Sequence, residues 1–518
     1  MERQLQARGM GRAPAPGEAQ LVVLNTCTVT AAADQDARAA IRRIHRENPG
    51  CEILVTGCYA QRAPEELAGL PGVKWVVGNS HKHRVAEIAV RDSAVGTGDA
   101  EQGAQEGRSD FVPLQRLRTN DQRQTGVFVS DIFAHTELLA APVFDAANER
   151  TRPNLKVQDG CDNRCSFCVI PYVRGQSRSL PLEQVLREVD GLVAGGYREV
   201  VISGINLGRW GRDLASGAEA PYSGSSFGTT KVVPSRLVPS RSVPSGFESS
   251  RLVPSRFVPS DFASSPFTSS GSVASCGAGQ RVGENRQERF EDLVHAILDH
   301  TSLEKLRISS VEPMDWSDEL IRLVAESPRI AKHAHVPMQS GSDAVLRRMH
   351  RKYRPWHYRE KIEKIRAAMP TAAIGADVMV GFPGETDSEF DETRRMVEEL
   401  PFTYLHVFTY SARPGTPAAD MRNQVPVRVA RDRNRILRDL AAQKKLEFMR
   451  SFVGKTIEAI TLNVFDGEHT EALTDNYLKL RLAGRHEANR WVTGTVDTME
   501  DELLMGRLKP FQPSLAAR

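Results

Sequence analysis

The sequence predicts an α/β protein with an N-terminal doubly wound parallel sheet, a central partial (β/α)6 barrel and a C-terminal small β-barrel. Its 518 residues are too many for one hydrophobic core and correspond to about three domains at roughly 150 residues each. Short apolar runs alternate with amphipathic helical segments over most of the chain, which is typical of parallel sheets covered by helices. Near the C-terminus short strands follow one another without helices, which is typical of a small barrel.

Composition restricts the class of protein. The 68 Lys and Arg residues nearly balance 65 acidic residues, so any nucleic-acid-binding surface must be local. The 7 cysteines are few, odd in number and clustered, which favours cofactor ligation in a reducing compartment over a disulfide framework. No run of about eighteen apolar residues and no signal-peptide pattern occurs. We therefore expect a cytoplasmic protein that does not span a membrane.

Residues 1–91 are predicted to form the first domain. A helix over Met1–Arg8 precedes a buried strand at Leu21–Leu24, and helices then alternate with strands at Ile53–Val55 and Trp75–Gly78. In such a doubly wound sheet, ligands bind beyond the carboxyl ends of the parallel strands.

Two cysteines follow strands of this domain. Cys27 comes after the first strand and Cys58 after the second. They are either ligands at the binding edge or two small buried residues, because free cysteine packs as a hydrophobic residue. Cys51 lies at the start of the second strand, about 20 Å from Cys58 at roughly 3.3 Å per residue. We expect Cys51 to be structural.

Residues 92–149 are polar and rich in loop-forming residues, and they are predicted to be a linker. Residues 150–450 are predicted to form the barrel, in which catalytic groups gather at the carboxyl ends of the strands. Six strands are expected near Leu155–Val157, Glu199–Ser203, Lys305–Ser309, His333–Val336, Ala376–Val380 and Tyr404–Phe408.

Residues 213–285 interrupt the barrel with repeats of Val-Pro-Ser and are rich in Ser, Pro and Gly. Such a segment cannot bury enough apolar surface to offset its ordering entropy, so a disordered surface insertion is expected. Cys276 within it is not expected to be a ligand. A Pro-rich recognition motif for a partner is the alternative.

Three cysteines follow the first predicted barrel strand. Cys161, Cys165 and Cys168 have the C-x-x-x-C-x-x-C spacing, which can place three thiolates around a cubane iron-sulfur cluster and leave the fourth iron open. A structural zinc site is the alternative. Zinc ordinarily takes four protein ligands, and no fourth Cys or His lies close by in the sequence.

The run from Gly160 to Gly175 resembles the signature of the radical S-adenosylmethionine (SAM) methylthiotransferases. The resemblance implies that Cys161, Cys165 and Cys168 hold a 4Fe-4S cluster whose open iron chelates SAM. Asn-Thr-Cys at Cys27 and Thr-Gly-Cys-Tyr-Ala-Gln at Cys58 are similar to two of the three motifs that hold an auxiliary 4Fe-4S cluster in this family. The sequence Asn-Thr-Cys-Thr-Val-Thr is most similar to the corresponding motif of the branch that acts on threonylcarbamoyladenosine in tRNA.

The resemblance also implies contacts with SAM at the strand ends. Glycines there permit close backbone approach to a ligand, and the polar residues correspond to family segments that face the cavity. The expected contacts are Gly195, Gly196, Glu199, Gly204, Asn206, Ser310, Glu312, Gln339 and Asp377. A helix-starting carboxylate is the alternative for Glu312, and a packed core residue is the alternative for His335.

Three segments are candidates for RNA contact. Asp343–Arg354 is densely basic, and a predicted helix over Val427–Ser451 has an excess of Lys and Arg on an aliphatic stripe of Val429, Ile436, Leu437, Leu440 and Leu446. Phosphate contact is the natural use of such surfaces, and a solvated charged face is the alternative. Residues 452–510 resemble the family's C-terminal tRNA-binding (TRAM-like) barrel, most clearly at Thr474-Asp475-Asn476-Tyr477.

The expected activity follows from the resemblance. It is transfer of a methylthio group to carbon 2 of threonylcarbamoyladenosine in the tRNA anticodon arm, with two SAM molecules per turnover. An electron donor and a sulfur donor would also be needed, and the sequence identifies neither. The alternatives are an enzyme of the isopentenyladenosine or ribosomal-protein aspartate branch, or an RNA-binding protein with impaired catalysis.

One family feature is missing from the sequence. Members have three cysteines for the auxiliary cluster, and only the second and third, Cys27 and Cys58, are present here. We expect a start that lies further upstream, with another strand ending in Gly-Cys, because Cys51 is poorly placed to substitute. The chain as written is then expected to hold one stable cluster, and a longer form two.

Overall fold

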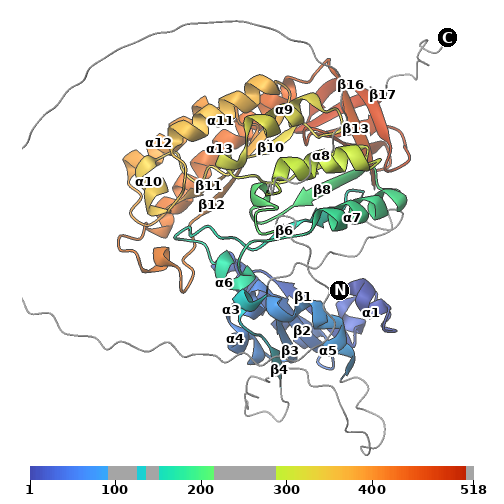
Figure 1. The fold of residues 1–518 in the computed structure, drawn as a ribbon, viewed down its shortest axis with the longest axis vertical. Coiled ribbons are helices and arrows are strands. Elements are labelled where there is room, and N and C mark those ends of the chain that lie inside the picture. Colours follow the sequence, from blue (N-terminus) through green and yellow to red (C-terminus); the bar gives the residue numbers. More distant parts are fainter. Residues whose placement is uncertain (92–124, 136–150, 215–286, 509–518) are drawn as a thin grey trace, which may run out of the picture. The chain divides into compact units, whose positions relative to one another are not determined.

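The computed structural model describes residues 1–91, 125–135, 151–214 and 287–508 (Figure 1). The predicted insertion at 213–285, with Cys276, and most of the predicted linker lie outside the described residues. Asp213, at the predicted start of the insertion, belongs to the folded structure, because its carboxylate accepts hydrogen bonds from Ser179 N and Ser179 Oγ at 2.7 and 2.5 Å.

The N-terminal part is a four-stranded parallel sheet in the order β1-β2-β3-β4. Its strands are β1 (Leu21–Thr26), β2 (Glu52–Gly57), β3 (Val73–Gly78) and β4 (Gly126–Phe128). Helices α1 (Glu2–Gln6), α2 (Ala31–Glu47), α3 (Cys58–Arg62), α4 (Pro64–Ala68) and α5 (Val85–Arg91) accompany the strands. The predicted parallel α/β sheet is confirmed, and its described strands follow one another in chain order. The prediction that 92–149 is only a linker is wrong, because β4 pairs with β3 and completes this sheet.

The central part contains the six predicted parallel strands. They are β5 (Asn154–Lys156), β8 (Glu199–Ser203), β9 (Lys305–Ile308), β10 (His333–His335), β11 (Ala373–Val380) and β12 (Tyr404–Thr409). They pair as β5-β8-β9 and β10-β11-β12, and isolated parallel bridges such as Ser310 with His335 join the two sets. The prediction of a partial (β/α)6 barrel is confirmed.

Helices cover the outer face of these strands (Figure 1). They are α7 (Leu182–Ala194), α8 (Phe290–His300), α9 (Asp318–Glu326), α10 (Asp343–Arg348), α11 (Pro355–Ala368), α12 (Asp387–Glu399) and α13 (Val427–Arg450). The strand residues Val200, Ile202, Leu306, Ile374 and Val378 are fully buried in the core between strands and helices. Because side chains alternate along a strand, the residues between them lie on the other, inner face.

The C-terminal part is a closed barrel in the order β13-β14-β15-β17-β16. Its strands are β13 (Thr456–Phe465), β14 (His469–Thr474), β15 (Lys479–Ala483), β16 (Trp491–Glu500) and β17 (Leu503–Leu508). The predicted small barrel is confirmed. Tyr477 lies in the turn between β14 and β15 with a φ of +67°.

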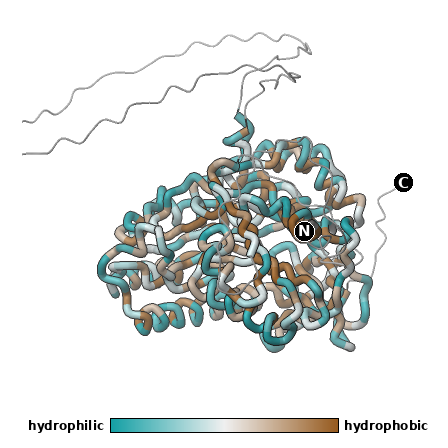
Figure 2. The backbone as a smooth tube through the Cα atoms, turned by 90° about the horizontal axis from the view of Figure 1, so that it is seen from below, coloured by the Kyte–Doolittle hydropathy of each residue, from teal (hydrophilic) through white to brown (hydrophobic). Residues whose placement is uncertain are grey.

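No described helix is long and apolar enough to cross a membrane. Figure 2 shows apolar and polar residues alternating in short stretches along the chain.

Candidate functional site

The cysteine loop lies between β6 (Gln158–Asp159) and α6 (Ile170–Arg174). It is anchored at its start, where Cys161 N donates to Gly175 O at 3.1 Å. Gly160 has a φ of +73°, and a Cβ there would lie 1.8 Å from Gln176 O, so this position requires glycine. In the middle of the loop, Ser166 Oγ donates to Arg348 O at 2.7 Å.

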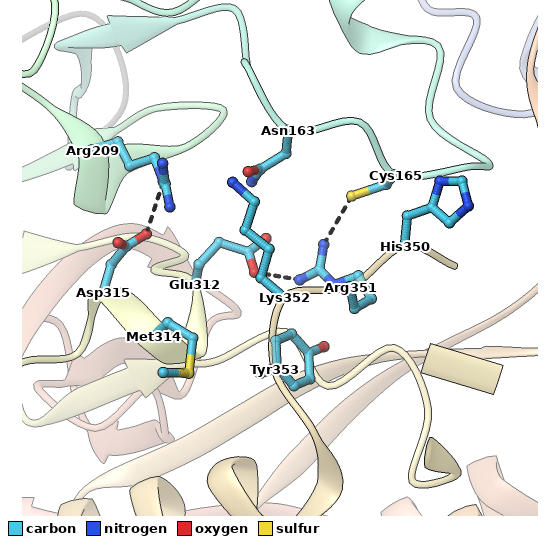
Figure 3. Close-up of a pocket in the computed structure, with 10 residues that line it drawn as sticks. All are labelled: Asn163, Cys165, Arg209, Glu312, Met314, Asp315, His350, Arg351, Lys352 and Tyr353. Carbon is cyan, nitrogen blue, oxygen red and sulfur yellow. Dashed lines mark hydrogen bonds and ion pairs between the residues drawn. The ribbon is translucent and has the colours of Figure 1, made fainter. Parts of the chain in front are cut away.

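Hydrogen-bond donors surround the sulfur atoms of this loop. Asn163 N donates to Cys161 Sγ at 3.4 Å, and Arg351 Nη1 donates to Cys165 Sγ at 3.3 Å (Figure 3). Burial raises the pKa of the Cys161 thiol and raises the pKa of Cys168 to about 12. Metal binding would have to displace these protons, because the ligand is the thiolate.

The spacing of the three thiols fits a cubane cluster better than a single ion. A tetrahedral zinc ion with Zn–S bonds of about 2.3 Å brings its sulfurs to within roughly 4 Å of one another. Among the described residues, the one group of three or more potential ligands within 4.8 Å is His335, Asp377 and His406. The three sulfurs of the loop do not all lie within 4.8 Å of one another, which accords with ligands to iron atoms at separate corners of a cubane.

Two predicted cofactor contacts carry buried polar atoms without a partner. Asn206 is 3% exposed and Gln339 is 8% exposed, and neither Asn206 Oδ1 nor Gln339 Oε1 has a hydrogen-bond partner among the described residues. Both lie at or beyond carboxyl ends of strands, and Asn206 Nδ2 is 3.8 Å from Cys161 Sγ. An unsatisfied buried polar atom costs about 1–3 kcal/mol, which a bound ligand can relieve. This part of the barrel fits SAM.

Two further predicted contacts, Gly204 and Glu312, lie near the cysteine loop. Gly204 lies against Gln158, whose Oε1 would be 2.8 Å from a Cβ at that position. Ser310 lies two residues after the end of β9. Glu312 lines a pocket with Cys165 and is paired with Arg351, which is nearly completely buried (Figure 3). Asp377 contacts two histidines, as described below.

The structure does not bring Gly195, Gly196 and Glu199 to this edge, and the prediction for them is corrected. Glu199 is the first residue of β8, whereas the cysteine loop lies beyond the last residues of the strands, about 13 Å away at roughly 3.3 Å per residue. Its fully buried carboxylate pairs with Arg307 at 2.5 Å. Gly195 ends α7 at the same far end, and Gly196 O accepts from Asn489 in the C-terminal barrel.

Cys27 and Cys58 lie side by side. The last residues of β1 and β2, Thr26 and Gly57, pair in register, so the two cysteines that follow them occupy adjacent strand ends. Cys58 is buried and accepts from Arg174 Nε at 3.1 Å and Asn79 Nδ2 at 3.4 Å, whereas Cys27 is exposed. Arg174 places a positive charge beside Cys58 Sγ, and the two cysteines could serve together as ligands of a metal group.

A buried ionic network supports the loop after Cys27. Asp34 is 4% exposed and accepts from Thr28 Oγ1 at 2.6 Å and from Arg62 Nη2 at 2.9 Å. Arg413, 2% exposed, also donates to Asp34 and contacts Thr28 at 2.9 Å.

Cys51 is buried, and burial raises its pKa. It precedes β2 and is thus at the opposite end of the strand from Cys58.

The basic segment Asp343–Arg354 is largely occupied by internal ion pairs. Arg348 pairs with Glu389 at 2.7 Å, Arg351 pairs with Glu312, and Arg347 and Arg354 both pair with Asp343. The free basic surface of this segment is therefore smaller than the sequence indicated. Its exposed side chains include Arg347 and Lys352.

Helix α13 buries a stripe that overlaps the predicted one in part, because Leu437 is fully buried and Leu440 packs against the barrel core. Its buried residues are Ala430, Arg433, Leu437, Ala441 and Met449, whereas Ile436 is 38% exposed. The stripe includes Arg433 because its guanidinium pairs with the buried Glu385 at 2.6 Å. Basic residues remain on the exposed face, and they are Arg428, Arg431, Arg435, Arg438, Lys445 and Arg450.

The Thr474–Tyr477 turn faces the barrel strands. Arg307 donates to Asp475 O at 2.7 Å and to Thr474 O at 3.3 Å, and its guanidinium lies 4.4 Å from the centre of the Tyr477 ring. His333 packs on the same ring at 4.7 Å. This turn therefore joins the two barrels.

Sequence reasoning missed several residues. Arg174 is distant in sequence from Cys58, and Tyr404 and His406 were taken only as strand residues. Each acquires its contacts through pairing of distant segments, which no local pattern records.

Two family models match parts of this chain. The family described as "Uncharacterized protein family UPF0004" matches residues 1–78, and the Radical SAM superfamily matches residues 155–207 and 283–397. A solved radical SAM methyltransferase, TsrM of Kitasatospora setae, covers 80% of this chain and 68% of its own at a TM-score of 0.44 and 14% identity.

Curated relatives match most of the chain. Threonylcarbamoyladenosine tRNA methylthiotransferase MtaB of Bacillus subtilis is 31% identical over 90% of this chain and 83% of its own length. MtaB of Aquifex aeolicus is 30% identical over 92% of this chain and 90% of its own. A tRNA-2-methylthio-N(6)-dimethylallyladenosine synthase of Novosphingobium aromaticivorans is 30% identical over 89% and 82%. The chain therefore belongs to the radical SAM methylthiotransferase family of enzymes, in the branch that contains the MtaB proteins.

Proposed function

We propose that this enzyme adds a methylthio group to carbon 2 of N6-threonylcarbamoyladenosine next to the anticodon of tRNA. The observation that carries the proposal is the presence of two thiol sites at the carboxyl ends of parallel strands. One is the loop of Cys161, Cys165 and Cys168, and the other is the pair Cys27 and Cys58. The MtaB relatives, matched over about nine-tenths of the chain, support this substrate.

Each thiol site has a proposed role. The three-cysteine loop would hold a 4Fe-4S cluster, which when bound supplies the electron for reductive cleavage of SAM. Asn206 and Gln339 would bind SAM through their unpartnered oxygens, and Arg351 would hold Cys165 and Glu312 in place. Cys27 and Cys58 would contribute to an auxiliary 4Fe-4S cluster, and Arg174 would offset the negative charge of its thiolates.

The C-terminal barrel and the exposed face of α13 are the proposed contacts for tRNA. Six exposed basic residues on one helix face can neutralise phosphates, and the C-terminal barrel is proposed as a TRAM-like module. A tRNA substrate and free cysteines fit a cytoplasmic location.

The test is complementation of a strain that lacks its own methylthiotransferase, with mass spectrometry of tRNA nucleosides. The wild-type chain should produce 2-methylthio-N6-threonylcarbamoyladenosine, and Cys165→Ala should produce none. Cys51→Ala is the matched control and should retain the product, because Cys51 is at the wrong end of its strand. Product formation by Cys165→Ala would contradict the proposal.

The second candidate is activity on dimethylallyladenosine, which the relative from Novosphingobium favours. Detection of the methylthio form of that nucleoside alone, in the same experiment, would establish this alternative and overturn the proposed substrate.

A further inference from the structure

A row of polar side chains lies on the inner face of the β10-β11-β12 sheet. Asp377 and His406 are register partners on β11 and β12, and His335 of β10 pairs with Gly375 two residues before Asp377. The neighbouring residues Ala376 and Val378 are fully buried on the opposite face, against the helices. The sheet therefore presents an ionisable surface to the inside of the barrel.

Asp377 joins two imidazoles. Its Oδ1 lies 3.2 Å from His335 Nε2 and 3.2 Å from His406 Nδ1. A carboxylate accepts hydrogen bonds, so both nitrogens carry protons. Burial would raise the pKa of Asp377, but the hydrogen bonds from the two histidines outweigh it and lower this pKa. The hydrogen bond to Asp377 in turn raises the pKa of His406.

The other ring nitrogen of His335, Nδ1, is held by Tyr404. Nδ1 of His335 is hydrogen-bonded to the Tyr404 hydroxyl at 2.9 Å, and His333 Nε2 is hydrogen-bonded to the same hydroxyl at 2.7 Å. Gly375 makes room for this arrangement, because a Cβ there would lie 1.9 Å from the Tyr404 ring. The orientation of Asp377 is thus set by hydrogen bonds that run from His333 through Tyr404 to His335.

His406 is the last residue in this series of hydrogen bonds, and its side chain is exposed. Its side chain is 65% exposed, whereas His335 is 9% exposed. Only Nδ1 of His406 is hydrogen-bonded to a described residue, namely Asp377. Nε2 therefore points away from Asp377 in a fixed orientation. It is a hydrogen-bond donor in the imidazolium form of His406, which the hydrogen bond to Asp377 favours. The residue lies three positions before the end of β12, below the strand ends where SAM is expected to bind.

We propose that His406 in its imidazolium form, oriented by Asp377, donates a hydrogen bond from Nε2 to the threonylcarbamoyl substituent of the target adenosine and thereby selects it over an apolar dimethylallyl chain. This inference rests on the proposed function. The threonylcarbamoyl group ends in a carboxylate, for which a donor held by Asp377 is complementary. A dimethylallyl chain offers no acceptor and would leave this polar face unpaired, which is the stronger kind of discrimination.

The test is binding of two anticodon stem-loop RNAs to the cluster-reconstituted full-length chain with SAM present, measured by fluorescence anisotropy. One RNA carries threonylcarbamoyladenosine next to the anticodon, and the other carries dimethylallyladenosine. The wild-type chain should prefer the first. His406→Ala should weaken binding of the first RNA at least about tenfold, equivalent to ~1.4 kcal/mol, and leave the second within about twofold.

Two further variants control for folding. His300→Ala removes an exposed histidine of α8 on the outside of the barrel and should bind both RNAs as the wild-type chain does. His406→Gln keeps a donor at this position and should recover part of the preference. Circular dichroism melting and the iron content of each variant should match the wild-type chain.

The outcomes separate the two proposals. A preference that persists in His406→Ala would overturn this inference and leave the proposed function intact. A wild-type chain without preference would overturn the proposed substrate and this inference with it. The ligand atoms of His335, Asp377 and His406 lie within 4.8 Å of one another, so loss of the preference after treatment with EDTA would overturn direct hydrogen bonding in favour of a bound cation.

Discussion

Replacing Glu199 with Gln tests whether this residue is structural, as its position indicates, or a contact for SAM. The Glu199 carboxylate is 0% exposed and Arg307 is 1% exposed, with 2.5 Å between Glu199 Oε1 and Arg307 Nε. A second cation, Arg152, lies 3.8 Å from the same oxygen. Gln keeps the shape and one acceptor but leaves the buried guanidinium without its counter-charge.

The expected cost follows from this burial. Removing one partner of a buried ion pair destabilises a protein by ~3–5 kcal/mol, far more than removing one partner of an exposed pair. Arg307 also donates to Thr474 O and Asp475 O, so part of its hydrogen bonding survives and the lower end of this range is expected. Affinity for SAM should change less than about twofold, because Glu199 is at the far end of β8.

Urea denaturation followed by tryptophan fluorescence is a suitable assay, since Trp210 and Trp316 are fully buried in the barrel core. Equilibrium dialysis of SAM against the cluster-reconstituted chain gives the affinity. The exposed Glu183→Gln on α7 is the matched control and should change stability by less than about 0.5 kcal/mol. A free energy of unfolding of Glu199→Gln that equals or exceeds that of the wild-type chain, together with a tenfold loss of SAM affinity, would refute this reasoning.

Three further predictions concern buried groups. Arg351→Met should shift the reduction potential of the loop cluster to a more negative value in an EPR-monitored titration, because a positive hydrogen-bond donor to Cys165 is lost. Arg433→Ala should destabilise the chain by ~3–5 kcal/mol by leaving buried Glu385 unpaired. Burial raises the pKa of Glu385 in the folded chain, so the protonated form is favoured there and this deficit should shrink as the solution is acidified. The Cys51 thiol should resist alkylation until the chain unfolds, because it is 3% exposed and burial raises its pKa.

Each of these has a control. Arg347→Met changes a neighbouring arginine that is 61% exposed and should leave the potential in place. A deficit in Arg433→Ala that grows on acidification would contradict the assignment of Glu385 as its cause. Exposed Cys27 should be alkylated in the cluster-free chain, and equal labelling rates for Cys27 and Cys51 would show that the burial of Cys51 is not maintained in solution.

Local patterns in the sequence determined the elements of this protein. The six barrel strands were predicted close to their observed positions because each is a short apolar run between amphipathic helices, and this periodicity reports directly on burial. The spacing of Cys161, Cys165 and Cys168 was likewise sufficient to predict a cluster loop, because ligands within one loop depend little on the rest of the fold. Cys27 and Cys58 were placed at one edge by the rule for parallel strands.

Only the tertiary structure decided which end of the barrel each residue occupies and which charges cancel. Glu199 and Asn206 are close in sequence. Glu199 nevertheless lies at the start of β8, whereas Asn206 lies beyond its end, next to Cys161. The basic appearance of Asp343–Arg354 was lost once Glu312 and Glu389 were brought to it from other elements. His406 obtained its orientation from Asp377 on the neighbouring strand. Such pairings join residues tens to hundreds of positions apart, so they depend on how the chain packs and leave no periodic signal in the sequence.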